Sequence, residues 1–218
     1  MRKVLVHSRL LAVLLGLAAQ CLSQGGVTNP PKTIFRDWNG ELVSNNEFVD
    51  IRMANFHYPD ATLVKKLDDG TTEFRLQKIP QEGMSVPAVS VKTVDGKTLN
   101  LAGLKGKVVV LNFWFIGCPV CLAHKPRLNE LAAKFAGNEN VIFIAMTADT
   151  SADVKRYVAK VRSDYIQVAD AKPALEMFNF AGYPKNIVIG KNGEIVYWRS
   201  TIKAWDKFES VIRRELSK

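Results

Sequence analysis

Two continuous apolar runs dominate the second half of the chain. Residues 108–115 (VVVLNFWF) and residues 141–146 (VIFIAM) are almost wholly apolar, which is typical of strands buried on both faces of a sheet. Between them we expect a helix from Pro119 to about Phe135. This order predicts two strands of one sheet connected by a helix.

Two hairpins are predicted on either side of this unit. Residues 90–101 alternate polar and apolar side chains around Asp95-Gly96, a dipeptide that favours tight turns between strands. Residues 186–189 and 194–198 are two further β-like runs, and the Lys-Asn-Gly sequence between them is again a turn signal.

Three further helices are expected. One begins at Ser151, with the serine as its cap and acidic charge in its first turn, and a short one covers residues 172–180. The last is amphipathic, and its apolar stripe holds Trp205, Phe208, Ile212 and Leu216. The whole pattern predicts an α/β fold, a central mixed sheet flanked by helices, without internal repeats.

An earlier part of the chain has shorter, β-like patterns. Residues 47–51, 62–67 and 72–79 are such runs, and Asp69-Gly70 marks a hairpin between the last two. We therefore expect a small β-rich unit ahead of the main fold.

These patterns divide the chain into three parts. Residues 1–23 are a predicted signal peptide, residues 24–85 a β-rich N-terminal extension, and residues 86–218 the main domain. The extension contains His57 in the sequence Phe-His-Tyr-Pro. Because no candidate partner stands near it in the sequence, we interpret His57 as a loop or packing histidine.

The first residues have the layout of a secretory signal peptide. Residues 10–19 form an uninterrupted apolar run behind three basic residues, and polar and small residues follow. The run is too short to span a bilayer comfortably, so we favour cleavage, after either Ala19 or Ser23. In an alternative reading Cys21 carries a lipid anchor, although Gln20 stands where that processing requires a small residue.

Composition narrows the function classes. The chain has 218 residues, 47% of them hydrophobic and 23% charged, with a formal net charge of +9, which is ordinary for a globular protein. No cluster of basic residues alternates with aromatic ones, which argues against nucleic-acid binding. Three cysteines are too few for a disulfide scaffold, so the close pair among them is the candidate functional site.

That pair is Cys118 and Cys121, in the sequence Gly-Cys-Pro-Val-Cys. It stands between a predicted buried strand and a predicted helix, where unpaired backbone N–H groups favour an anion. The pKa of the Cys118 thiol should therefore fall from about 8.5 towards roughly 3.5–7.5. Cys121 lies one turn further on the same helix face, so Cys118 is the predicted nucleophile and Cys121 the resolving thiol.

The cysteine pair could also serve other kinds of site. A structural zinc site needs further ligands that the chain does not space suitably, and haem attachment needs a histidine where Leu122 stands. A copper or other metal site built from Cys118, Cys121 and His124 stays open as an alternative. A peroxiredoxin-like enzyme is a second alternative. Counted back from Cys121, however, Trp114 stands where the peroxiredoxin motif has proline, and Cys118 stands where it has threonine or serine. Both differences argue against this alternative.

At these residues the chain resembles the thioredoxin-like TlpA/ResA group of exported thiol-disulfide oxidoreductases. The similar stretches are residues 106–121 (GKVVVLNFWFIGCPVC) and 182–193 (GYPKNIVIGKNG), and the likeness covers about residues 85–218. It implies a thioredoxin fold in which Pro184 is cis and faces the cysteine pair. The exposed backbone of Tyr183 would then pair with a substrate segment as an added strand.

The resemblance also implies supporting roles. Asn112 stands where thioredoxin has a buried acid and is limited to hydrogen bonding, Trp114 shapes the surroundings of the pair, and Pro126 kinks the helix. Two positions depart from the family pattern. Gly117 replaces a tryptophan, and His124 replaces a glutamate that helps to activate the resolving thiol. His124 is therefore either a substitute base or an exposed helical residue without a role.

Together these observations predict an exported enzyme of the periplasm or cell envelope. It would reduce or exchange disulfides in envelope proteins such as apocytochromes, without a cofactor or a metal, because the electrons reside on the two sulfurs. The resemblance implies an upstream membrane electron donor. The membrane would be contacted only through the possible lipid anchor at Cys21, and the direction of electron flow stays open.

Overall fold

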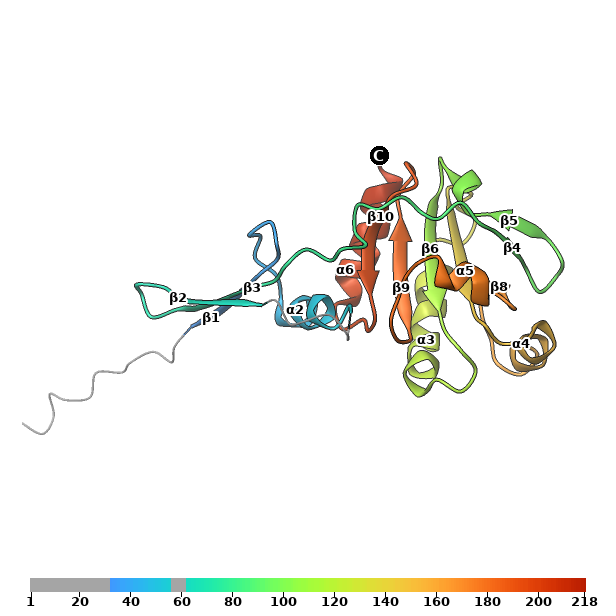
Figure 1. Ribbon diagram of the computed structural model, residues 1–218, viewed down its shortest axis with the longest axis horizontal. Helices are drawn as coiled ribbons and strands as arrows, with labels where there is room; N and C mark the ends of the chain where they lie inside the picture. Colours follow the sequence, from blue (N-terminus) through green and yellow to red (C-terminus); the bar gives the residue numbers. More distant parts are fainter. Residues whose placement is uncertain (1–31, 56–61) are drawn as a thin grey trace, which may run out of the picture.

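The computed structural model describes residues 32–55 and 62–218 of the chain (Figure 1). The predicted signal peptide, its cleavage site, Cys21 and His57 lie outside the described residues. Within the described ranges, no helix combines the length and the apolar character needed to cross a membrane.

The centre of the fold is a five-stranded mixed sheet with the order β10-β9-β6-β7-β8. Its strands are β6 (Val108–Phe113), β7 (Val141–Met146), β8 (Ile166–Val168), β9 (Lys185–Ile189) and β10 (Ile195–Arg199). β6, β7 and β8 are parallel, and β9 is antiparallel to both β6 and β10. The predicted buried strands and the C-terminal hairpin are confirmed. β8 was not predicted, because its three residues are too few for a periodic pattern.

The core lies on both faces of this sheet. Val108 and Val110 of β6 belong to the cluster that packs under α3 (Pro119–Ala133) and α6 (Trp205–Leu216). Val109 and Leu111 belong to the opposite cluster. Successive side chains of a strand point to opposite faces, so the continuous apolar run of β6 supplies both clusters at once.

The remaining helices of the main domain are short. They are α4 (Ser151–Val158), α5 (Lys172–Glu176) and the 3-10 turn η1 (Ala102–Leu104). Thr150 caps α4, because its side chain accepts a hydrogen bond from the Asp153 N–H; the expectation that Ser151 is the cap was wrong by one residue. In α6, Phe208 and Ile212 of the predicted stripe are buried, and Trp205 and Leu216 pack beside them.

The extension forms a separate three-stranded sheet with one helix (Figure 1). Its elements are β1 (Thr33–Arg36), α2 (Asn45–Arg52), β2 (Leu63–Lys66) and β3 (Thr72–Arg75), and the strand order is β1-β3-β2. The predicted hairpin at Asp69-Gly70 is confirmed, with β2 and β3 antiparallel. β3 ends at Arg75, earlier than the expected residue 79.

The expected β-run at residues 47–51 is wrong, since these residues belong to α2. The Ser44 side chain accepts a hydrogen bond from the Glu47 N–H and so caps the helix. Ser-x-x-Glu is a signal for the start of a helix, and here it outweighs the β-propensity of the following residues. The Phe48 ring of α2 packs against Phe35 and Phe74 of the small sheet.

Both margins of the five-stranded sheet are bonded to other segments. The predicted hairpin of β4 (Ser90–Lys92) and β5 (Thr98–Asn100) is confirmed. Between these two strands, the Val94 N–H donates to the Gln167 carbonyl of β8 at 2.9 Å. On the other side, residues 83–86 run along β10. The Gly83 N–H donates to the Ile195 carbonyl at 2.8 Å, and the Ile195 N–H donates to the Met84 carbonyl at 2.8 Å.

Candidate active site

Cys118 and Cys121 form a disulfide at the start of α3. The Cα–Cα distance is 5.3 Å, and both residues are buried. Cys118 is the N-cap of the helix, Pro119 follows it in the first turn, and the Cys121 N–H donates to Cys118 Sγ at 3.1 Å. An N–H group aimed at this sulfur, together with the positive end of the helix, stabilises negative charge on Cys118 when the disulfide opens.

The loop that precedes β9 lies against the loop that carries the cysteines. The Tyr183-Pro184 peptide bond is cis, as the resemblance implies. The Tyr183 ring packs edge-on against Phe115, with 5.3 Å between the ring centroids, and against Phe180 at 5.1 Å. Because Phe115 stands just ahead of Cys118, these contacts bring the Tyr183-Pro184 loop beside the cysteine pair.

Asp149, which sequence reasoning missed, binds the backbone of the loop that leads to Cys118. Its Oδ2 atom accepts a hydrogen bond from the Ile116 N–H at 2.8 Å and another from the Thr147 hydroxyl at 2.8 Å. Burial, and to a smaller extent the charge of Asp149, raise the pKa of Tyr183. The only sequence signal for Asp149 was its position just beyond the end of a buried strand.

Asn112 is buried in the middle of the sheet. Its Nδ2 atom donates to Asn186 Oδ1 at 2.9 Å, and Asn186 Nδ2 donates to the Ser200 carbonyl at 3.3 Å. These bonds connect β6, which leads to the cysteines, with β9, which follows Pro184. Asn112 thus acts as a hydrogen-bonding group, in agreement with the limit that its amide imposes.

Trp114 and Lys125 form a second feature that the sequence did not reveal. Trp114 is fully buried in the core cluster that contains both cysteines. The Lys125 Nζ atom lies 3.8 Å from the centroid of its ring and 5.2 Å from that of Tyr157. Burial lowers the pKa of Lys125 to about 8. Its spacing of four residues from Cys121 was the available signal, since i and i+4 share a helix face.

His124 is half-buried, so the expectation that it is exposed is wrong, and its role stays a prediction. Its ring packs edge-on against Trp205, with 5.7 Å between the centroids, and burial lowers its pKa. Within residues 32–55 and 62–218, no three histidine, cysteine or acidic side chains are grouped to hold a metal ion. The structure therefore gives no support to a metal site of Cys118, Cys121 and His124.

The surroundings of the disulfide offer apolar surface. Phe115, Val120 and Leu122 are exposed next to the two cysteines in the chain. A Cβ atom on Gly117 would lie 3.5 Å from the Phe115 ring, so a side chain at this position would contact the ring. Such a rim suits an extended apolar segment of a partner protein.

Comparisons with known proteins place these features in context. A family model described as Redoxin matches residues 81–208. The chain is 31% identical over 118 residues to the thiol-disulfide oxidoreductase ResA of Bacillus anthracis, covering 53% of this chain and 68% of that protein. It is 27% identical over 117 residues to the thioredoxin-like protein YneN of Bacillus subtilis, covering 53% and 69%.

Solved structures give the same picture. A thiol:disulfide interchange protein from Bacteroides sp. has a TM-score of 0.53 and 25% identity, with 63% of this chain and 91% of that chain covered. The exposed lipoprotein thioredoxin Etrx1 of Streptococcus pneumoniae has a TM-score of 0.50 and 25% identity, with 58% and 98% covered.

Proposed function

This chain belongs to the Redoxin family and is a thiol-disulfide oxidoreductase, and from this premise we propose that it acts outside the cytoplasm on disulfides of envelope proteins. Its likeness to a solved thiol:disulfide interchange protein and to the solved thioredoxin Etrx1 also confirms the predicted thioredoxin fold. The observation that carries the proposal is the Cys118–Cys121 disulfide at the N-terminus of α3, beside the Tyr183-Pro184 loop.

The reductive cycle starts from the dithiol. The Cys118 thiolate attacks one sulfur of a substrate disulfide, forms a mixed disulfide, and releases the other substrate sulfur as a thiolate that takes up a proton. Cys121 then loses its proton and attacks Cys118 Sγ, which frees the second substrate thiol and forms the Cys118–Cys121 bond. Two electrons pass from the enzyme to the substrate, and a separate thiol donor must return them.

The Tyr183-Pro184 loop also binds the substrate. The backbone of Tyr183 pairs with an extended substrate segment as an added strand, and the exposed Phe115, Val120 and Leu122 side chains contact its apolar residues. Asn112 and Trp114 act indirectly, because they support the strand and the core behind the cysteines.

Two observations support export. Residues 10–19 have the apolar pattern of a signal peptide, and the similar Etrx1 structure is named an exposed lipoprotein thioredoxin. An oxidising compartment also gives a dithiol of this kind substrates to act on. We propose the periplasm or cell envelope as its location and a membrane protein as its electron donor.

A trapping experiment tests the proposal. Cys121→Ser, expressed with its own leader in a bacterial host, should accumulate mixed disulfides between Cys118 and envelope proteins, which non-reducing gels and mass spectrometry identify. Cys118→Ser is the matched control and should trap nothing. Adducts limited to cytoplasmic proteins would contradict the proposed location, and no Cys118 adducts at all would contradict Cys118 as the nucleophile.

The resting redox state then decides the direction. A reductase is held mainly as the dithiol in the cell, whereas an oxidase is held as the disulfide. Alkylation of acid-quenched cells with a mass-tagged reagent measures this ratio. We expect the dithiol to predominate, and a fully oxidised resting pair would contradict the reductive direction.

A further inference from the structure

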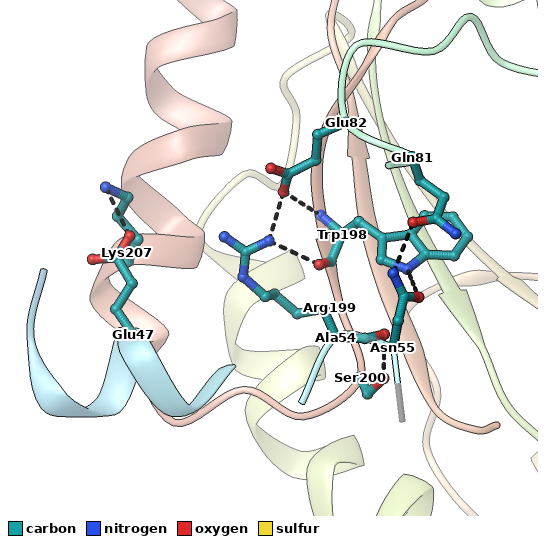
Figure 2. Close-up of polar contacts among 9 residues, drawn as sticks. All are labelled: Glu47, Ala54, Asn55, Gln81, Glu82, Trp198, Arg199, Ser200 and Lys207. Atoms are coloured by element: carbon teal, nitrogen blue, oxygen red, sulfur yellow. Dashed lines mark hydrogen bonds and ion pairs between the residues drawn. The ribbon is translucent and has the colours of Figure 1, made fainter. Parts of the chain in front are cut away.

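Lys185 follows Pro184 directly, and its side chain is fully buried. The Nζ atom donates a hydrogen bond to the Ala54 carbonyl at 2.7 Å and another to Ser200 Oγ at 2.5 Å. The Ser200 hydroxyl donates to the same carbonyl at 2.9 Å, as Figure 2 shows. The charged side chain of Lys185, next to the Tyr183-Pro184 loop, therefore binds the backbone of the N-terminal extension.

A buried lysine is a costly way to fill space. Removing an ammonium group from water is unfavourable unless hydrogen bonds replace its hydration, and burial lowers the pKa of Lys185 to about 8. A methionine has a similar length without this penalty. The bonds that Lys185 makes are thus the feature that distinguishes it from an apolar residue at the same place.

The acceptor of this lysine is itself held firmly. Ala54 follows the end of α2, and the neighbouring Asn55 accepts a hydrogen bond from Trp198 Nε1 at 3.1 Å and donates one to Gln81 at 2.9 Å (Figure 2). Within α2, the Asp50 carboxylate accepts hydrogen bonds from the N–H groups of Lys203 and Ala204. The segment that carries the Ala54 carbonyl is therefore bonded to the main domain through Asp50 before it and through Asn55 after it.

The backbone of Lys185 is bonded as well. The Lys185 carbonyl accepts a hydrogen bond from Asn112 Nδ2 at 3.5 Å, and Lys185 pairs with Phe113 of β6 in the sheet. Lys185 thus joins two supports, the strand that leads to Cys118 and the extension. Both meet one residue after Pro184.

We propose that Lys185 is a positioning residue: bonded to the Ala54 carbonyl, it holds the Tyr183-Pro184 loop in the arrangement that accepts a substrate strand. The extension then takes part in substrate binding without contacting the substrate. The inference rests on the proposed function, in which this loop binds the substrate. It adds a role for residues 44–55, to which the redox chemistry assigns none.

Lys185→Met tests the inference, with Lys191→Met as its matched control. Lys191 follows the other end of β9 and also donates to a backbone carbonyl, that of Leu216 at 2.7 Å. The assay is the reduction of oxidised insulin with dithiothreitol as donor, for KM and kcat. The rate of Cys118 alkylation by iodoacetamide and the reduction potential are measured on the same samples.

We expect Lys185→Met to raise KM about tenfold, the loss that corresponds to one hydrogen bond of a charged group. The alkylation rate and the potential should stay at the wild-type values, because the cysteines are untouched, and Lys191→Met should leave KM unchanged. If Lys185→Met does not fold, Ser200→Ala decides, since it keeps the ammonium group and removes one of its acceptors; its KM should rise about threefold.

Two results would overturn the inference. One is an unchanged KM in a folded Lys185→Met protein, or in Ser200→Ala where that variant decides. The other is a parallel change of KM, alkylation rate and potential, which indicates general loss of structure. A wild-type protein that reduces no protein disulfide refutes the proposed function itself, and this inference with it. If the wild type is active and the deciding variant has the wild-type KM, the inference alone is refuted and the proposed function stands.

Discussion

The Lys125 ammonium lies 3.8 Å from the centre of the Trp114 ring, inside the core that also contains Cys118 and Cys121. The ring face offers the cation an attractive electrostatic partner. This attraction recovers only part of the hydration that the ammonium loses on burial. Lys125 is therefore a residue that costs the folded state stability while it places positive charge near the redox pair.

Lys125→Met should stabilise the protein at pH 7 by about 1–3 kcal/mol, because it removes a buried charge and keeps the side-chain length. The pKa of Lys125 is lowered from 10.5 to about 8, so between these values the unfolded chain binds the proton more strongly. Wild-type stability thus rises from pH 8 to pH 10.5, and the advantage of the variant shrinks. Urea unfolding at pH 7 and pH 10 measures both.

Lys155→Met is the control for this experiment, since Lys155 is exposed on α4. Exposed substitutions of this kind change stability by at most about 0.5 kcal/mol. A Lys125→Met protein that is less stable than wild type at pH 7 would show that the ring contact outweighs the burial penalty.

His124→Gln should reduce the sensitivity of the protein to acid. Burial lowers the pKa of His124 below its ordinary value of 6.5, so the unfolded chain takes up the proton first as the pH falls. The wild type therefore loses stability below about pH 6.5, and above that value the residue is neutral in both states. Urea unfolding at pH 7.5 and pH 5 should show a smaller loss for the variant; an equal loss contradicts the prediction.

Asn112→Asp should destabilise the protein at pH 7 by about 2–4 kcal/mol, because a buried carboxylate would face the Asn186 oxygen that now accepts a hydrogen bond. Protonation would let the new carboxyl group donate to that oxygen. Since burial raises the pKa of such a group, the deficit relative to wild type should narrow towards pH 5.

Asn112→Leu separates this charge effect from simple loss of the bond. It removes the donor without adding a titratable group, so its deficit in unfolding free energy should be the same at pH 7 and pH 5. A pH-independent deficit for Asn112→Asp would mean that its carboxyl group is already protonated at pH 7.

Asp50→Ala should cost about 2–3 kcal/mol of unfolding free energy, because it leaves the N–H groups of Lys203 and Ala204 without their acceptor at the start of α6. Asp50→Asn keeps one acceptor oxygen and should lose less. Hydrogen exchange in the first turn of α6 should speed up in Asp50→Ala, and unchanged protection there would show that water replaces the carboxylate.

The parts of the fold that local patterns encode were predicted from the sequence. The continuous apolar runs of β6 and β7 fit only strands that are buried on both faces of the sheet. The spacing of Cys118 and Cys121 brings the two sulfurs together across one helical turn, where they form the disulfide. By contrast, the short β8 and the helix α2 had too few residues for a clear period. The one local signal for α2 is the capping sequence that begins at Ser44.

The missed site residues depend on contacts between distant segments. Asp149 meets Ile116 across 33 positions of the chain, and Lys185 meets Ala54 across 131. A lysine in a sequence is ordinarily a surface residue. Nothing local to Lys185 signals its burial, and for Lys125 the spacing of four residues from Cys121 is the one local signal. Only the tertiary packing shows which lysines lie inside.

Both outer strands of the five-stranded sheet are bonded to other segments of the chain. Residues 83–86 occupy the edge of β10, the Glu82 carboxylate accepts the Trp198 N–H (Figure 2), and the β4-β5 hairpin covers β8. Open sheet edges act as templates on which other chains aggregate. The margins of this sheet are thereby shielded from pairing with other chains, including the substrate segments that the proposed function brings to the protein.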